Sequence, residues 1–130
     1  MRSVDTNVLA RFILADDVPQ HRIASAVLAE PVWVTPTVWL ELGWLLHKRL
    51  KLARSVVADA MTVLLSIETI RTQGSDRLHW AIEQYRSGAD WADAMHLIMS
   101  EDVADKFATF DKGVARKVGE AASVSVEILA

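Results

Sequence analysis

Five short apolar segments recur along the chain, and a longer stretch with a helical pattern separates most of them. They are RSV, VWV, IETIR, FAT and VSVEI, at residues 2–4, 32–34, 67–71, 107–109 and 124–128. Short apolar strands that alternate with helices are typical of a parallel sheet covered by helices on both faces. The sequence therefore predicts an α/β fold with three layers, α/β/α, around a mainly parallel central sheet of about five strands.

Prolines and glycines indicate where the intervening helices begin and end. Pro19 fits the first turn of a helix over 19–30, which stops at Pro31 because proline cannot continue a helix. Thr35 followed by Pro36 predicts the N-cap and first turn of a helix that runs to about residue 49. Similar signals predict further helices at 53–65, 76–87, 90–100 and 112–121.

The composition fits one compact domain, residues 1–130. With 52% hydrophobic and 24% charged residues, a chain of this length can bury a core of its own. The sequence contains no cysteine, which excludes disulfides and thiolate metal sites and favours the reducing cytoplasm. We expect a soluble cytoplasmic protein, since no signal peptide or membrane-spanning stretch stands out. The formal net charge of −3 argues against a protein that binds nucleic acid through its overall charge alone.

Two aspartates directly follow predicted strands. Asp5 follows the first apolar segment, and Asp111 follows FAT in FATFDKG. Parallel α/β sheets bind ligands at the carboxyl ends of their strands, where loops and helix N-termini converge. We therefore expect Asp5 and Asp111 to lie at the same edge of the sheet, despite their separation in sequence.

Three further acids lie on predicted helices. Glu41 interrupts an apolar stripe, although a single helical glutamate can equally lie at the solvent edge. Asp90 is a helix N-cap by position, and Asp93 lies in the first turn of that helix, where the helix dipole keeps a carboxylate ionised. Asp93 is therefore a candidate metal ligand. His96 lies beside apolar residues, so packing explains it better than ligation.

A cluster of these acids would need a cation. Four carboxylates within a few ångströms of one another cannot all ionise unless a positive charge offsets them. Oxygen ligands without cysteine favour a hard divalent ion, Mg²⁺ or Mn²⁺. The sequence therefore predicts a divalent metal site at the ligand edge of the sheet.

These segments resemble the PIN-domain ribonucleases, and specifically the VapC-type toxins of bacterial toxin–antitoxin systems. The resemblance rests on VDTNVL, the glutamate of TVWLELGWLL, DWADAMHLIMS and FATFDKG, in the family's order along the chain. It implies an acidic metal-binding quartet with a fifth candidate acid, namely Asp5, Glu41, Asp93 and Asp111 with Asp90. It also implies three small polar residues that support the site by hydrogen bonding, namely Thr6, Asn7 and Thr109.

The resemblance implies a metal-dependent endoribonuclease. In such an enzyme, Mg²⁺ or Mn²⁺ polarises the scissile phosphate of RNA and activates a water, and the product keeps its phosphate on the 5′ end. The resemblance also implies a homodimer, a cognate antitoxin protein and a larger toxin–antitoxin assembly as partners. Arg11, Lys112 and Arg116 lie close in sequence to the acids and are candidates for phosphate contacts, although solvated surface charge explains them equally well.

The five tryptophans offer a second route to nucleic acid, because bases stack on exposed aromatic rings. They all fall within apolar stretches, so core packing or a subunit interface is the better interpretation. The residues concerned are Trp33, Trp39, Trp44, Trp80 and Trp91.

Two other classes of protein share part of this pattern. Aspartates at strand ends with Mg²⁺ also occur in aspartyl-phosphate phosphatases, phosphotransferases and receiver domains. Against that reading, the phosphatases carry a second aspartate two residues after the first, where this chain has Asn7. A non-enzymatic module whose acids face an arginine-rich partner is the other alternative, and cleavage of RNA would separate it from a nuclease.

Overall fold

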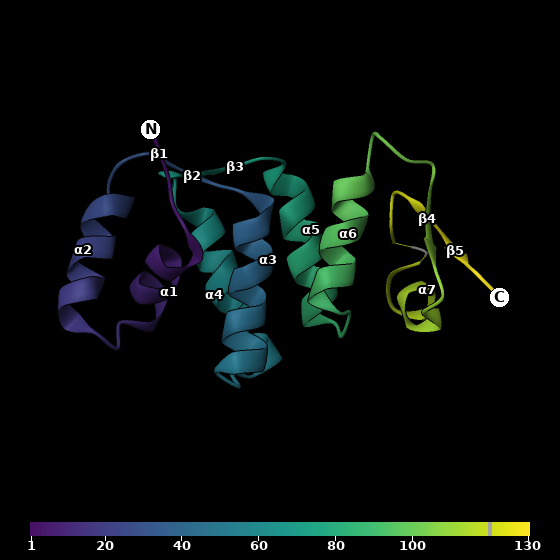
Figure 1. Cartoon of the computed structure of the whole chain (residues 1–130), viewed down its shortest axis with the longest axis horizontal. Helices are drawn as coiled ribbons and strands as arrows, with labels where there is room; N and C mark the ends of the chain where they lie inside the picture. Colours follow the sequence, from purple (N-terminus) through teal and green to yellow (C-terminus); the bar gives the residue numbers. More distant parts are fainter. Residues whose placement is uncertain (120) are drawn as a thin grey trace. The chain divides into compact units, whose positions relative to one another are not determined.

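The computed structural model describes residues 1–119 and 121–130. These residues form two compact units, Met1–Ser75 and Asp76–Ala130. Each unit contains parallel strands and helices of its own (Figure 1).

The first unit is built on a small parallel sheet. Its strands are β1 (Arg2–Ser3), β2 (Val32–Val34) and β3 (Ile70–Thr72), in the order β1-β2-β3. Arg2 pairs with Val32, and Val32 pairs with Ile70. Val32 and Val34 are completely buried, as expected for a central strand covered on both faces.

Helices connect these strands. They are α1 (Thr6–Leu14), α2 (Val18–Leu28), α3 (Pro36–Trp44) and α4 (Arg54–Ser66), with a π-helical turn, η1 (Leu45–Arg49), at the end of α3. The first of them, α1, begins directly after Asp5 and was not assigned from the sequence pattern. The long helix predicted to end near residue 49 does so, although its last turn is π-helical. The other helices of this unit differ from their predicted bounds by a few residues.

Trp39 links a helix of the first unit to the sheet. Its side chain is completely buried, and its indole N–H donates to Thr72 Oγ1 at 3.0 Å. The Thr72 hydroxyl in turn donates to the Val34 carbonyl at 3.2 Å. These two hydrogen bonds therefore connect α3 to β3 and β2, and they give the buried indole N–H of Trp39 an acceptor.

The second unit contains most of α5 (Ser75–Arg86), followed by α6 (Trp91–Ser100), β4 (Lys106–Thr109), α7 (Lys112–Val118) and β5 (Ser125–Ile128). The strands β4 and β5 pair in parallel, with Thr109 opposite Ile128. Buried apolar side chains from α6, α7 and the loop before α6 form one cluster, namely Ala89, Leu97, Val114 and Val118. The predicted helix over 112–121 ends at Val118, and residue 120 of that prediction lies outside the described residues.

The predicted α/β class with parallel strands is confirmed. Strands occur at all five predicted places, and the described strand pairs are parallel. Their pairing differs from the single sheet of about five strands that we expected, because three strands pair in the first unit and two in the second. The strands are only two to four residues long, so an apolar pattern finds them without specifying their partners.

Two local predictions need refinement. Thr35 occupies the N-cap of α3, but its hydroxyl pairs with the Thr37 hydroxyl at 2.8 Å and does not cap the helix backbone. Core packing holds for Trp39 and Trp91, whereas Trp44 is 55% exposed.

Among the described residues, no helix is both long and apolar enough to cross a membrane.

Replacing Trp39 by phenylalanine tests the link between α3 and the sheet. The Trp39→Phe variant loses the indole donor and leaves a small cavity, so the free energy of unfolding should fall by about 2 kcal/mol. Urea unfolding followed by circular dichroism measures this change. Trp44→Phe is the matched control at an exposed position, and its stability should stay within about 0.5 kcal/mol of wild type. Equal effects of the two substitutions would contradict the assigned role of Trp39.

Candidate functional site

Asp5 begins α1, which explains a carboxylate at the end of the first strand. It is the N-cap of the helix, and its side chain accepts a hydrogen bond from the Val8 backbone N–H at 3.3 Å. An N-cap carboxylate satisfies one of the free amides in the first turn and benefits from the positive end of the helix dipole. The Asp5 residue is exposed, so its carboxylate is accessible to a ligand.

Thr6 joins α1 to the glutamate of α3. Its side chain is buried, and its hydroxyl donates a hydrogen bond to Glu41 Oε1. The two residues are 35 positions apart in the sequence. The contact therefore holds the Glu41 carboxylate beside the first turn of α1, immediately after Asp5 in the chain.

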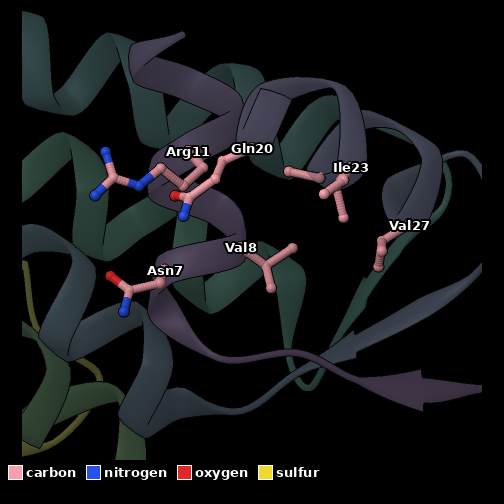
Figure 2. A pocket seen from close by; sticks show the side chains of 7 residues that line it. Asn7, Val8, Arg11, Gln20, Ile23 and Val27 are labelled. Atoms are coloured by element: carbon pink, nitrogen blue, oxygen red, sulfur yellow. The ribbon is translucent and has the colours of Figure 1, made fainter. Parts of the chain in front are cut away.

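Asn7 and Arg11 line a hollow between α1 and α2. The hollow has a volume of about 280 Å³, and its other lining residues are Val8, Gln20, Ile23, Ala24 and Val27. Figure 2 shows the polar side chains at one end of this hollow and Ile23 and Val27 at the other. Arg11 also forms an ion pair with Asp16 at 3.0 Å.

Three acids of the second unit line a single cavity of about 180 Å³. Asp90 is the N-cap of α6 and accepts a hydrogen bond from the Asp93 backbone N–H at 3.0 Å. Asp111 is the N-cap of α7, and its Oδ1 accepts from the Gly113 N–H at 2.7 Å. Thr109 Oγ1 accepts from the Asp111 backbone N–H at 3.0 Å, which fixes the turn that carries this carboxylate.

The ionisation of Asp93 reflects its surroundings. Partial burial raises the pKa of the Asp93 carboxyl, and the neighbouring charges of Asp90 and Asp111 raise it further, whereas His96 lowers it. Both causes disfavour the charged form in the absence of a cation. The three carboxylates therefore make the cavity electronegative, and carboxylate oxygens are the donor type that Mg²⁺ and Mn²⁺ take.

The predicted acids fall into two groups, one in each unit. Asp5 and Glu41 belong to the first unit, and Asp90, Asp93 and Asp111 belong to the second. Among the residues that the structure describes, no three His, Asp or Glu side chains form a group that could hold a metal ion by itself. The carboxylate oxygens are the donor type for a hard divalent ion, but those of Asp90, Asp93 and Asp111 do not come together as a ligand set.

His96 is exposed, and the expectation that it packs is met only by one ring contact. Its ring stacks on Phe107 with a centroid separation of 6.2 Å and an interplanar angle of 21°. The contact joins α6 to β4 in the second unit.

Lys117 and Gly88 also line the acidic cavity, and neither was predicted from the sequence. The predicted phosphate contacts Lys112 and Arg116 are exposed, as Lys117 is, but they are not among the described residues that line this cavity. Helix periodicity could have pointed to Lys117, because it lies four residues after Gly113 and therefore on the same face of α7. This inference requires knowing that Gly113 faces the cavity, which the sequence does not show.

A model of the PIN domain family matches residues 3–120. The match covers nearly the whole chain and includes both units, so the chain belongs to the PIN domain family. PIN domains are in general metal-dependent nucleases, which places this chain in a nuclease family. A comparison with curated proteins found no match.

Removing the Asp93 charge should stabilise the metal-free protein. For an acid whose pKa is raised by folding, ionisation costs stability, and this cost grows as the pH rises from about 4 through the folded-state pKa. In EDTA at pH 7, Asp93→Asn should therefore melt roughly 2–4 °C above wild type. The difference should shrink towards pH 4. The control Asp105→Asn, at an exposed position, should leave the melting temperature nearly unchanged, and a lower melting temperature for Asp93→Asn would contradict the assignment.

Proposed function

We propose that this chain is a Mg²⁺- or Mn²⁺-dependent endoribonuclease and that it acts as the toxin of a toxin–antitoxin pair. The observation that carries the proposal is the convergence of Asp90, Asp93 and Asp111 on one cavity in a chain of the PIN domain family. The family favours a nuclease over the aspartyl-phosphate alternative. RNA as substrate and the toxin role rest on the resemblance of the acid-bearing segments to VapC-type toxins.

The metal ligands in this proposal are the four acids Asp5, Glu41, Asp93 and Asp111, with Asp90 as a fifth candidate. Bound Mg²⁺ or Mn²⁺ would supply Lewis-acid polarisation of the phosphate and a water of lowered pKa. The supporting residues act on the acids themselves. Thr6 donates to Glu41, and Thr109 holds the backbone of Asp111. Asn7 follows Thr6 in the first turn of α1 and is exposed, so its amide is available to substrate.

The apolar hollow between α1 and α2 supports an antitoxin partner. Ile23 is 65% exposed at this hollow, and Val8 and Val27 line it as well (Figure 2). An exposed apolar groove of this kind fits an apolar segment of a partner protein. We also propose that the protein forms a homodimer, joins a larger toxin–antitoxin assembly and is located in the cytoplasm.

Cleavage of RNA with charge-neutral variants tests the proposal. The purified protein should cleave a labelled single-stranded RNA in Mn²⁺ and stop in EDTA. Asp5→Asn and Asp93→Asn should each lower the rate by about 100-fold, because each removes a ligand charge but retains the shape of the side chain. If both acids serve one reaction centre, the double variant should lose little more than either single variant. Cleavage unchanged in the variants would identify a contaminating nuclease, and no cleavage of any RNA in any divalent metal would overturn the proposal.

Gly113→Ala separates activity from stability at the Asp111 end of the site. A Cβ on Gly113 would lie 2.9 Å from Asp111 Oδ1, so the carboxylate must shift. Alanine is also the better helix former, by about 1 kcal/mol in a helix interior. We therefore expect Gly113→Ala to lose about 10-fold in cleavage rate while the melting temperature changes little, because the helix propensity of alanine offsets the weakened Asp111 cap. A variant that keeps full activity would show that the position of the Asp111 carboxylate is unimportant.

A further inference from the structure

Lys117 is a basic side chain at an otherwise acidic cavity. Of the described residues that line this cavity, the charged ones are Asp90, Asp93, Asp111 and Lys117. Lys117 lies in the last turn of α7, and Asp111 is the N-cap of the same helix. The cavity therefore has carboxylates at the starts of α6 and α7 and an ammonium group from the end of α7.

The Lys117 ammonium lies against bare backbone at Gly88. A Cβ built on Gly88 would come within 3.4 Å of Lys117 Nζ. Gly88 has a φ of +118°, a conformation that side-chain-bearing residues rarely adopt, so no side chain is expected at this position. Lys117 is exposed, and its Nζ lies at the Gly88 edge of the cavity, two residues before Asp90.

The ammonium is not committed to the acids of the cavity. Among the ion pairs of the described residues, none joins Lys117 to Asp90, Asp93 or Asp111. The nearby charges that act on Asp93 are those of Asp90, Asp111 and His96. Lys117 therefore shares the cavity with the carboxylates and keeps its three N–H donors available for an anion.

We infer that Lys117 binds a phosphate group of the RNA substrate at this cavity. The inference rests on the proposed nuclease function and names a residue that would position its substrate. A polyanion approaching three carboxylates is repelled, and a lysine provides a compact positive charge that binds a phosphate oxygen. Lys117 would hold a phosphate at the rim of the cavity while the acids hold the metal.

A simpler role for Lys117 would be to neutralise the aspartates without touching RNA. The two roles differ in what the loss of the charge affects. If Lys117 neutralises the acids, its removal lowers the stability of the metal-free protein. If Lys117 binds phosphate, its removal weakens substrate binding and reduces the dependence of binding on salt, with little change in stability.

Substitution of Lys117 with a matched lysine control tests the inference. Cleavage of a short single-stranded RNA in Mn²⁺ is measured for Lys117→Ala, Lys117→Arg and Lys106→Ala at several salt concentrations. Lys106 is an exposed lysine of the same unit, on β4, and it pairs with Glu127 at 3.3 Å. We expect Lys117→Ala to raise KM about 10-fold with kcat nearly unchanged, as for the loss of one charged hydrogen bond. Its log–log salt slope should be shallower by about 0.7.

The other two variants show whether the loss is specific to Lys117 or follows from removing any lysine charge. Lys117→Arg should recover most of the wild-type KM, and Lys106→Ala should resemble wild type. An unchanged KM and salt slope in Lys117→Ala would overturn the inference, and so would an equal loss in Lys106→Ala. A lower melting temperature in EDTA with an unchanged KM would assign Lys117 to neutralisation of the acids.

Failure of the nuclease proposal gives a different result. If the wild type cleaves no RNA, binding of labelled RNA is followed by fluorescence anisotropy in EDTA, where no metal contributes. Weaker binding and a shallower salt slope for Lys117→Ala alone would still support the phosphate contact. Equal affinities of wild type and Lys117→Ala would overturn it.

Discussion

The structure depends on carboxylates that begin helices. Asp5, Asp90 and Asp111 are the N-caps of α1, α6 and α7, and each accepts a hydrogen bond from a backbone amide of the first turn. The cap fixes where the helix starts and fixes the carboxylate at that point. The same side chain thus serves the local fold and presents a carboxylate at the start of its helix, where a ligand can be bound. This double use explains why an acid comes shortly after β1 and again after β4.

Capping alone does not explain the charge at the cavity of the second unit. Asp93 lies one turn into α6, where the helix dipole favours its ionised form, yet its partial burial and its acidic neighbours make ionisation unfavourable. Aspartates arranged in this way keep an unfavourable electrostatic energy that a bound cation would relieve. Such an arrangement is common at functional sites and costs stability in the metal-free protein.

The sequence predicted the local elements better than their assembly. A capping residue and an apolar period act within a few residues, so Asp90, Asp111 and the helices that follow them could be placed from the sequence alone. The pairing of five strands as three and two could not, because strands as short as β1 carry too few side chains to specify a partner. Lys117 was missed for a related reason. Its place at the cavity depends on the fold of the Gly88 loop beside α7, and neither the pattern of α7 nor the charge of the chain reveals that neighbour.

The N-cap role of Asp5, Asp90 and Asp111 has a genetic consequence if the chain is a toxin. Asparagine caps a helix about as well as aspartate does, but it contributes no negative charge to a metal site. A single base change converts an aspartate codon into an asparagine codon. Cells that carry the toxin gene would therefore have a short mutational route to a product that keeps its helix caps and cuts RNA far more slowly.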